Sequence, residues 1–151
     1  MISRVEEAVR TFEEGYNCAQ SVFVTYAGLF GLDRETTLKM TSSMGGGIGR
    51  MREVCGVVSA MALLAGLKEG NTDPENEEAK EAIYQLTRQM ADKFKEKHQT
   101  IICRELLGIE GMEKSARPSK RTESYYSARP CSRLVATAAG IVEEVLLADM
   151  K

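Results

Sequence analysis

Apolar residues recur at every third or fourth position along most of this chain, and no segment shows the strict alternation of a β-strand. This helical period runs through stripes such as Cys18, Val22, Tyr26 and Phe30. The length of 151 residues is enough for one hydrophobic core. The pattern therefore predicts one all-α domain over residues 1–151, a compact bundle of about six to seven helices.

Glycine and capping residues predict where the first helices begin and end. The first helix stops at Gly15, and the second runs from about Asn17 to Phe30. Asp33 is placed to cap a short third helix. The fourth is expected from about Met51 to Leu67, and because it is apolar nearly all round we expect it at the centre of the bundle.

The second half of the chain predicts three more helices and one long loop. The sequence Asp73-Pro74-Glu75 combines a cap, a proline and an acid, as is typical of a helix start. Thr100 is placed to cap a short helix that ends at Leu107, and Pro130 opens the last helix. Residues 109–129 are polar, basic and aperiodic, so we expect a loop there that is either solvated or forms a lid or an anion-attracting rim.

The charge pattern excludes some classes of partner. The formal net charge is -2 and charges of both signs are interspersed, so we expect no nucleic-acid partner. The longest apolar run, Val54 to Leu67, is shorter than the roughly 18 residues of a membrane helix, so we expect no membrane insertion. The N-terminus has no apolar secretion core, which predicts a cytoplasmic protein. Homo-oligomerisation stays open.

Four cysteines are the main candidates for chemistry: Cys18, Cys55, Cys103 and Cys131. A reducing cytosol disfavours a structural disulfide framework, and no C-x-x-C motif occurs. With Asn17, Thr100 and Pro130 as helix starts, and with Cys55 following a glycine run, each cysteine falls near a helix N-terminus. There the free backbone N–H groups and the helix dipole stabilise a thiolate, which is both a nucleophile and a metal ligand.

These cysteines lie in stretches that resemble a known family. The stretches are Gly15-Tyr16-Asn17-Cys18-Ala19-Gln20-Ser21-Val22, then Gly45-Gly46-Gly47-Ile48-Gly49-Arg50 leading to Cys55-Gly56, then Cys103-Arg104-Glu105-Leu106-Leu107-Gly108, and Cys131. Together they resemble the C_GCAxxG_C_C family, to which a redox role is ascribed because of its cysteines. The resemblance implies a redox-active protein.

The chain departs from the CGAxxG motif of that family. Its segment is Cys55-Gly56-Val57-Val58-Ser59-Ala60, so the cysteine and the first glycine carry over while the alanine and the last glycine do not. Ala60 still allows close packing, but Val57 is bulkier than alanine. The pocket near Cys55 is therefore expected to differ from that of the motif.

The glycine run before Cys55 is a candidate for binding an anionic cofactor through Gly46, Gly47 and Gly49. It follows a helix and matches no nucleotide-binding motif, so a close approach of the backbone to the thiols is the preferred interpretation.

Three functional hypotheses remain open. The first is thiol redox chemistry at Cys18, Cys55, Cys103 and Cys131, with Cys55 as the attacking thiolate and an unidentified redox partner; it requires no cofactor. The second is a zinc or iron–sulfur site that uses the same four cysteines as metal ligands. The third is a helical assembly domain with inert cysteines.

Overall fold

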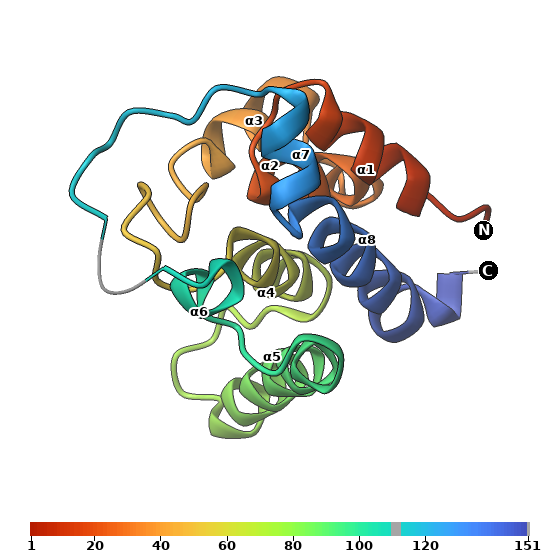
Figure 1. Ribbon diagram of the computed structural model, residues 1–151. Helices are drawn as coiled ribbons and strands as arrows, with labels where there is room; N and C mark the ends of the chain where they lie inside the picture. The colour runs from red at the N-terminus through yellow and green to blue at the C-terminus, as the bar shows by residue number, and fades with distance from the viewer. Residues whose placement is uncertain (110–112, 151) are drawn as a thin grey trace.

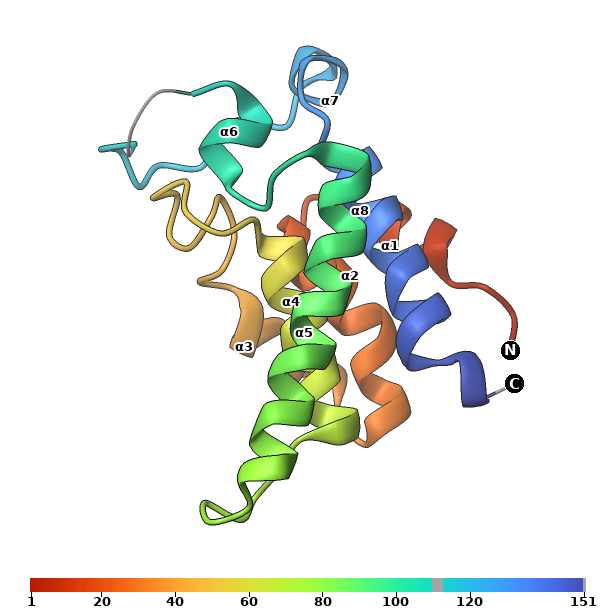
Figure 2. The same ribbon diagram turned by 90° about the horizontal axis from the view of Figure 1, so that it is seen from below.

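Helix α4 (Gly56–Glu69) is the centre of the bundle. Its residues Val57, Ala60, Met61 and Leu64 are fully buried. It packs against α2 (Cys18–Ala27), α5 (Glu77–His98) and α8 (Cys131–Ile141), as Figures 1 and 2 show. The central position predicted for this apolar helix is confirmed.

The computed structural model describes residues 1–109 and 113–150, and that part of the chain has eight α-helices and no strand. The all-α fold class is thereby confirmed. The remaining α-helices are α1 (Val5–Glu13), α3 (Arg34–Thr41), α6 (Cys103–Leu107) and α7 (Glu123–Ala128). Short helical turns η1 (Gly28–Phe30), η2 (Val142–Leu146) and η3 (Ala148–Met150) extend α2 and α8.

Asn17 caps α2, as the sequence predicts, and it does so within a capping box. Asn17 accepts a hydrogen bond from the backbone N–H of Gln20, and the Gln20 side chain accepts one from the Asn17 backbone N–H. The Asn17 amide also donates to the carbonyls of Thr41 and Ser42 at the end of α3. This residue therefore holds the loop after α3 against the first turn of α2.

The predicted starts of α4 and α5 are wrong. Helix α4 begins at Gly56 rather than Met51, because the preceding backbone takes positive φ angles that no right-handed helix allows. Helix α5 begins at Glu77, with Asn76 as its cap, and not at Pro74. The Asp73 side chain instead accepts from the N–H of Glu75 and closes a turn before the helix.

The loop predicted over residues 109–129 contains a helix that the sequence did not predict. Helix α7 begins after Thr122, whose hydroxyl accepts from the backbone N–H of Tyr125. It is only six residues long, too short for its apolar residues to show a period. Residues 110–112 of the predicted loop lie outside the described part.

The segment before α4 makes a left-handed turn. The φ angles are positive from Gly46 to Arg50, at 65°, 71°, 65°, 55° and 65°, and again at Arg52, at 62°. Backbone N–H groups of Arg52 and Glu53 donate to the carbonyls of Gly46 and Gly47. Left-handed backbone is rare for residues with a Cβ, so this turn is a strained element.

An isolated antiparallel bridge joins the end of this turn to the entrance of α6. Val54 pairs with Ile102, the N–H of Cys55 donates to the Ile101 carbonyl, and the N–H of Cys103 donates to the Glu53 carbonyl. Figure 2 shows α6 and α7 near one end of α5. The bridge therefore brings the starts of α4 and α6 to the same end of the bundle.

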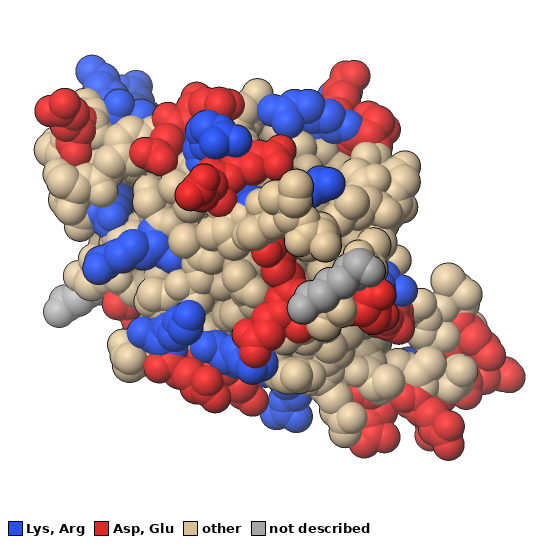
Figure 3. Space-filling view, turned by 90° about the vertical axis from the view of Figure 1, so that its right-hand side faces the viewer, with Lys and Arg blue, Asp and Glu red and all other residues tan. Residues whose placement is uncertain are grey.

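Among the described residues, none of the helices combines the length and apolar character needed to cross a bilayer. On the face shown in Figure 3, basic and acidic side chains lie next to one another, and no patch of a single charge covers it. The interspersed charges expected from the sequence are confirmed on that face.

Candidate functional site

The four cysteines line one cavity of about 290 Å³. Cys18, Cys103 and Cys131 are the first residues of α2, α6 and α8, and Cys55 is the N-cap of α4. The prediction that every cysteine lies at a helix start is confirmed, and all four are free thiols. Four helix N-termini therefore surround a shared space.

Cys103 reaches its position differently from the prediction. Ile102, not Thr100, is the N-cap residue of α6. The Thr100 hydroxyl accepts from the N–H of Ile102 and donates to Glu105. Thr100 thus braces the turn before the helix, and Cys103 is the first helical residue instead of the third.

The thiols of Cys18 and Cys55 lie close enough to shift each other's pKa in opposite directions. The close approach depends on Gly56, since a Cβ at that position would lie 2.7 Å from the Cys18 Sγ and 3.0 Å from the carbonyl of Met44. Real Cβ atoms do not come that close. The glycine that follows Cys55 is therefore required for the contact between these two sulfur atoms.

The Cys18 thiol ionises most easily. The hydrogen bond from Cys55 lowers the pKa of Cys18 to about 7 against the opposing effect of burial, and the backbone N–H groups of Gly46, Ala19 and Gly56 assist. Ala19 and Gly56 belong to the first turns of α2 and α4, so two helix N-termini stabilise this one thiolate.

Cys55 behaves in the opposite way. It is only 4% exposed, and both its hydrogen bond with Cys18 and its burial raise the pKa of Cys55 above the usual range. The sequence favoured Cys55 as the attacking thiolate because it follows a glycine run at a helix start. The structure instead buries Cys55 beside Cys18, and both effects disfavour its thiolate.

The pKa values of the other two thiols, Cys103 and Cys131, are raised as well. Burial raises the pKa of Cys103, although the Arg52 guanidinium, which donates to its sulfur at 3.6 Å, acts against this. Burial and the negative charge of Cys18 raise the pKa of Cys131 to about 11. At neutral pH both thiols are therefore protonated.

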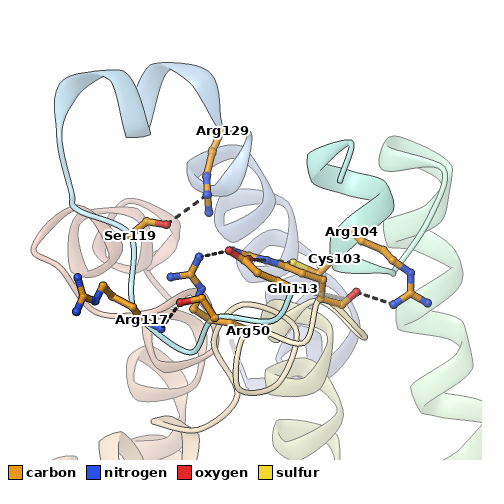
Figure 4. Close-up of polar contacts among 9 residues, drawn as sticks. Arg50, Cys103, Arg104, Glu113, Arg117, Ser119 and Arg129 are labelled. Carbon is orange, nitrogen blue, oxygen red and sulfur yellow. Dashed lines mark hydrogen bonds and ion pairs between the residues drawn. The ribbon is translucent and has the colours of Figure 1, made fainter. Parts of the chain in front are cut away.

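Arg50 and Arg52 line the cavity, and both pair with Glu113, which does not line it. Figure 4 shows the contact between Arg50 and Glu113. Arg50 Nη2 and Arg52 Nε each donate to a Glu113 oxygen at 2.7 Å. The hydrogen bond from Arg52 is the main reason why the pKa of Glu113 is lowered. No local sequence pattern points to Glu113, because its partners lie 61 and 63 residues away.

Arg121, Arg129 and Tyr125 line the cavity from the region predicted as a basic loop. The Arg129 guanidinium lies 4.8 Å from the centre of the Tyr125 ring, and that of Arg121 lies 5.0 Å from it. Arg129 also donates to the hydroxyl of Ser119 at 3.4 Å (Figure 4). The excess of basic residues in this region was the sequence signal that pointed to them.

The three glycines singled out in the sequence have different positions. Gly46 and Gly49 line the cavity, whereas Gly47 lies beneath it against Cys103. A Cβ at Gly47 would be 2.7 Å from the Cys103 Cβ and 2.6 Å from the nitrogen of Glu53. Because Gly47 has no side chain, the backbone at this position packs closely against Cys103 and Glu53.

The geometry gives the metal hypothesis no support. Within residues 1–109 and 113–150, no three or more His, Cys, Asp or Glu side chains are arranged to hold a metal ion. His98 does not line the cavity and instead shares a hydrogen bond of 2.9 Å with the Thr137 hydroxyl. Metal binding by the four cysteines would require them to move.

Fold and site together define an all-helical protein with four free thiols around one cavity. The chain belongs to the C_GCAxxG_C_C family, described as "Putative redox-active protein", whose family model matches residues 16–145. That range contains all four cysteines, Arg50, Arg52 and the basic segment. No curated protein sequence and no solved structure matches the chain.

Proposed function

We propose that the protein is a dithiol–disulfide oxidoreductase in which Cys18 is the attacking thiolate and Cys55 the resolving thiol. The observation that carries this proposal is the close pair of thiols whose pKa values move in opposite directions, down to about 7 at Cys18 and up at Cys55. A thiol with a pKa near the ambient pH is the best attacking group in thiol–disulfide exchange.

The reaction proceeds in two exchanges. The Cys18 thiolate attacks one sulfur of a substrate disulfide, the substrate S–S bond breaks, and one substrate thiolate leaves. The Cys55 thiol gives its proton to this first substrate thiolate, and the Cys55 sulfur then attacks the Cys18 sulfur. A Cys18–Cys55 disulfide forms, and the second half of the substrate leaves as a thiolate. The substrate gains two electrons, and the protein dithiol loses two.

Cys103 and Cys131 have no attacking role in this proposal, because their pKa values are raised. An external dithiol reduces the Cys18–Cys55 disulfide and completes the cycle. In a reducing environment the protein is a reductant of disulfides, and the reverse exchange oxidises dithiols. Cytoplasmic thiol exchange of this kind requires no metal or cofactor.

The test is peptide mapping by mass spectrometry after the reduced protein reacts with one equivalent of bis(2-hydroxyethyl) disulfide. A Cys18–Cys55 linkage is expected, and Cys55→Ser should retain a mixed disulfide on Cys18. Cys18→Ser should form neither product. Linkage confined to other cysteine pairs, or no reaction in the folded protein, would contradict the proposal; the second result is the one expected of a domain with inert cysteines.

A further inference from the structure

We infer that the cavity selects small disulfides that carry carboxylate groups, and that Arg129 and Arg121 bind those groups. This inference rests on the proposed thiol chemistry of Cys18 and specifies its substrate class. It is drawn from the charge, the hydrogen bonds and the size of the cavity.

The charge of the lining is unbalanced. Four arginines, Arg50, Arg52, Arg121 and Arg129, line the cavity together with the cysteines, and no Asp or Glu of the described residues does so. Charged groups within a space of low polarity and restricted solvent act more strongly than they do on an open surface. The lining therefore favours anions over neutral or cationic molecules.

A single carboxylate forms ion pairs with two of these arginines. Glu113 pairs with both Arg50 and Arg52, whose side chains are only 16% and 4% exposed. The Nε of Arg50 is buried and has no hydrogen-bond partner among the described residues. Two arginines that share one carboxylate leave a net positive charge on this side of the cavity.

The other two arginines have only uncharged partners in the described part of the chain. Arg121 donates to the carbonyls of Phe12 and Tyr16, at 3.0 Å and 2.9 Å, and Arg129 donates to the Ser119 hydroxyl. Both also lie against the ring of Tyr125. These contacts orient the guanidinium groups and leave their charges unneutralised.

The size of the cavity limits the substrate to a small molecule. A volume of about 290 Å³ is at the lower end of ligand pockets. Phe12, Leu106 and Leu134 supply apolar lining for the carbon atoms of such a molecule. The bond exchanged is the same as in the proposed function: the substrate S–S bond breaks, and the Cys18–Cys55 bond forms.

The experiment compares three disulfides of similar size and different charge: dithiodiglycolate, bis(2-hydroxyethyl) disulfide and cystamine. The rate of Cys18 oxidation is measured for each, with 2-mercaptoethanol as the reference thiol. A thiolate alone prefers the cationic disulfide. The protein should reverse this order and react on the order of tenfold faster with dithiodiglycolate than with cystamine, and 1 M NaCl should reduce the difference severalfold.

A set of variants assigns the effect to the arginines. Arg129→Gln should lower the dithiodiglycolate-to-cystamine rate ratio by on the order of tenfold, since a hydrogen bond to a charged group is lost. Arg129→Lys keeps the charge and should retain most of the ratio. Arg88→Gln, an exposed arginine on α5 outside the cavity, is the matched control and should leave the ratio unchanged.

The outcomes separate the two proposals. If none of the three disulfides oxidises Cys18, the proposed function is wrong, and this inference falls with it. If all three react at equal rates, or cystamine reacts fastest, the thiol chemistry stands and the anion selectivity is overturned. An unchanged ratio in both Arg129 variants overturns the assignment to Arg129.

Discussion

The Arg52 guanidinium donates to the Cys103 sulfur at 3.6 Å, from a residue whose own φ is +62°. The same guanidinium also binds Glu113, so one buried cation joins a thiol of α6 to the segment before α7. A non-glycine residue in this conformation is strained by about 1–3 kcal/mol. The contacts at the cavity compensate for that strain.

Replacement of this cation should affect Cys103 first. In Arg52→Met the pKa of Cys103 should rise further, because the hydrogen bond that opposes its burial is lost. The measurement is the pH dependence of Cys103 alkylation, read by mass spectrometry. Arg104→Met removes an ion pair with Glu53 and a hydrogen bond to the Arg52 carbonyl, but no hydrogen bond to the Cys103 sulfur, and should leave that dependence unchanged. Equal profiles for Arg52→Met and the unaltered protein would contradict the role given to Arg52.

Gly56→Ala should separate Cys18 from Cys55. The added Cβ would meet the Cys18 Sγ and the Met44 carbonyl, so the first turn of α4 must shift, at a cost of about 1–3 kcal/mol of stability. The yield of the Cys18–Cys55 disulfide should also fall, because the two sulfur atoms are moved apart. Urea unfolding and peptide mapping measure the two effects.

Gly66→Ala is the matched control for this substitution. Gly66 lies in the same helix, and no atom lies within 4 Å of a Cβ built there. Alanine at this position should stabilise the protein by up to about 1 kcal/mol and leave the disulfide yield unchanged. A Gly56→Ala protein as stable and as readily oxidised as Gly66→Ala would show that the close contact is not needed.

Alkylation of Cys18 should follow pH with a midpoint near 7, since the pKa of Cys18 is lowered to about 7. In Cys55→Ala the midpoint should move upward, because the hydrogen bond that contributes most to the shift is gone. Cys131→Ala should leave the midpoint in place. Iodoacetamide labelling of the reduced protein between pH 5 and pH 10, on the order of minutes per point, provides the titration. A midpoint at the value of a free thiol would remove Cys18 from its attacking role.

Cys131 should make the protein less stable in alkali. Its folded pKa of about 11 lies above the ordinary thiol value of 9.0, so its contribution to stability is fully present below pH 9 and is lost as the pH rises toward 11. The loss is about 2–3 kcal/mol at most. The difference in unfolding free energy between the protein and Cys131→Ala should therefore narrow from pH 8 to pH 11. A constant difference would contradict the raised pKa.

Much of the fold follows from local patterns in the sequence. Asn17 and Asp33 cap the helices that they were predicted to cap, and the all-round apolar segment is the central helix α4. These features depend on residues close in sequence, so one sequence is enough to predict them. The starts of α4 and α5 were wrong where turn geometry competed with the helical pattern.

The site was predictable only in part. Helix-start signals placed all four cysteines near N-termini, but four cysteines allow three pairings, and nothing local selects the contact between Cys18 and Cys55. The largest cause of the raised pKa of Cys55 is its hydrogen bond with Cys18, which is far away in the sequence. The left-handed backbone between these two residues includes Ile48 and Arg50. Residues with a Cβ give no propensity signal for such a conformation.

The left-handed turn over residues 46–52 has a consequence for the thiols that it contacts, Cys18 and Cys103. Its strain makes this segment easier to open than the helices that surround it, so the turn should detach by local opening while the bundle stays folded. Amide hydrogen exchange in this turn would then be faster than in α4. The contacts of Gly46 with Cys18 and of Arg52 with Cys103 would break at the frequency of that opening and independently of global unfolding.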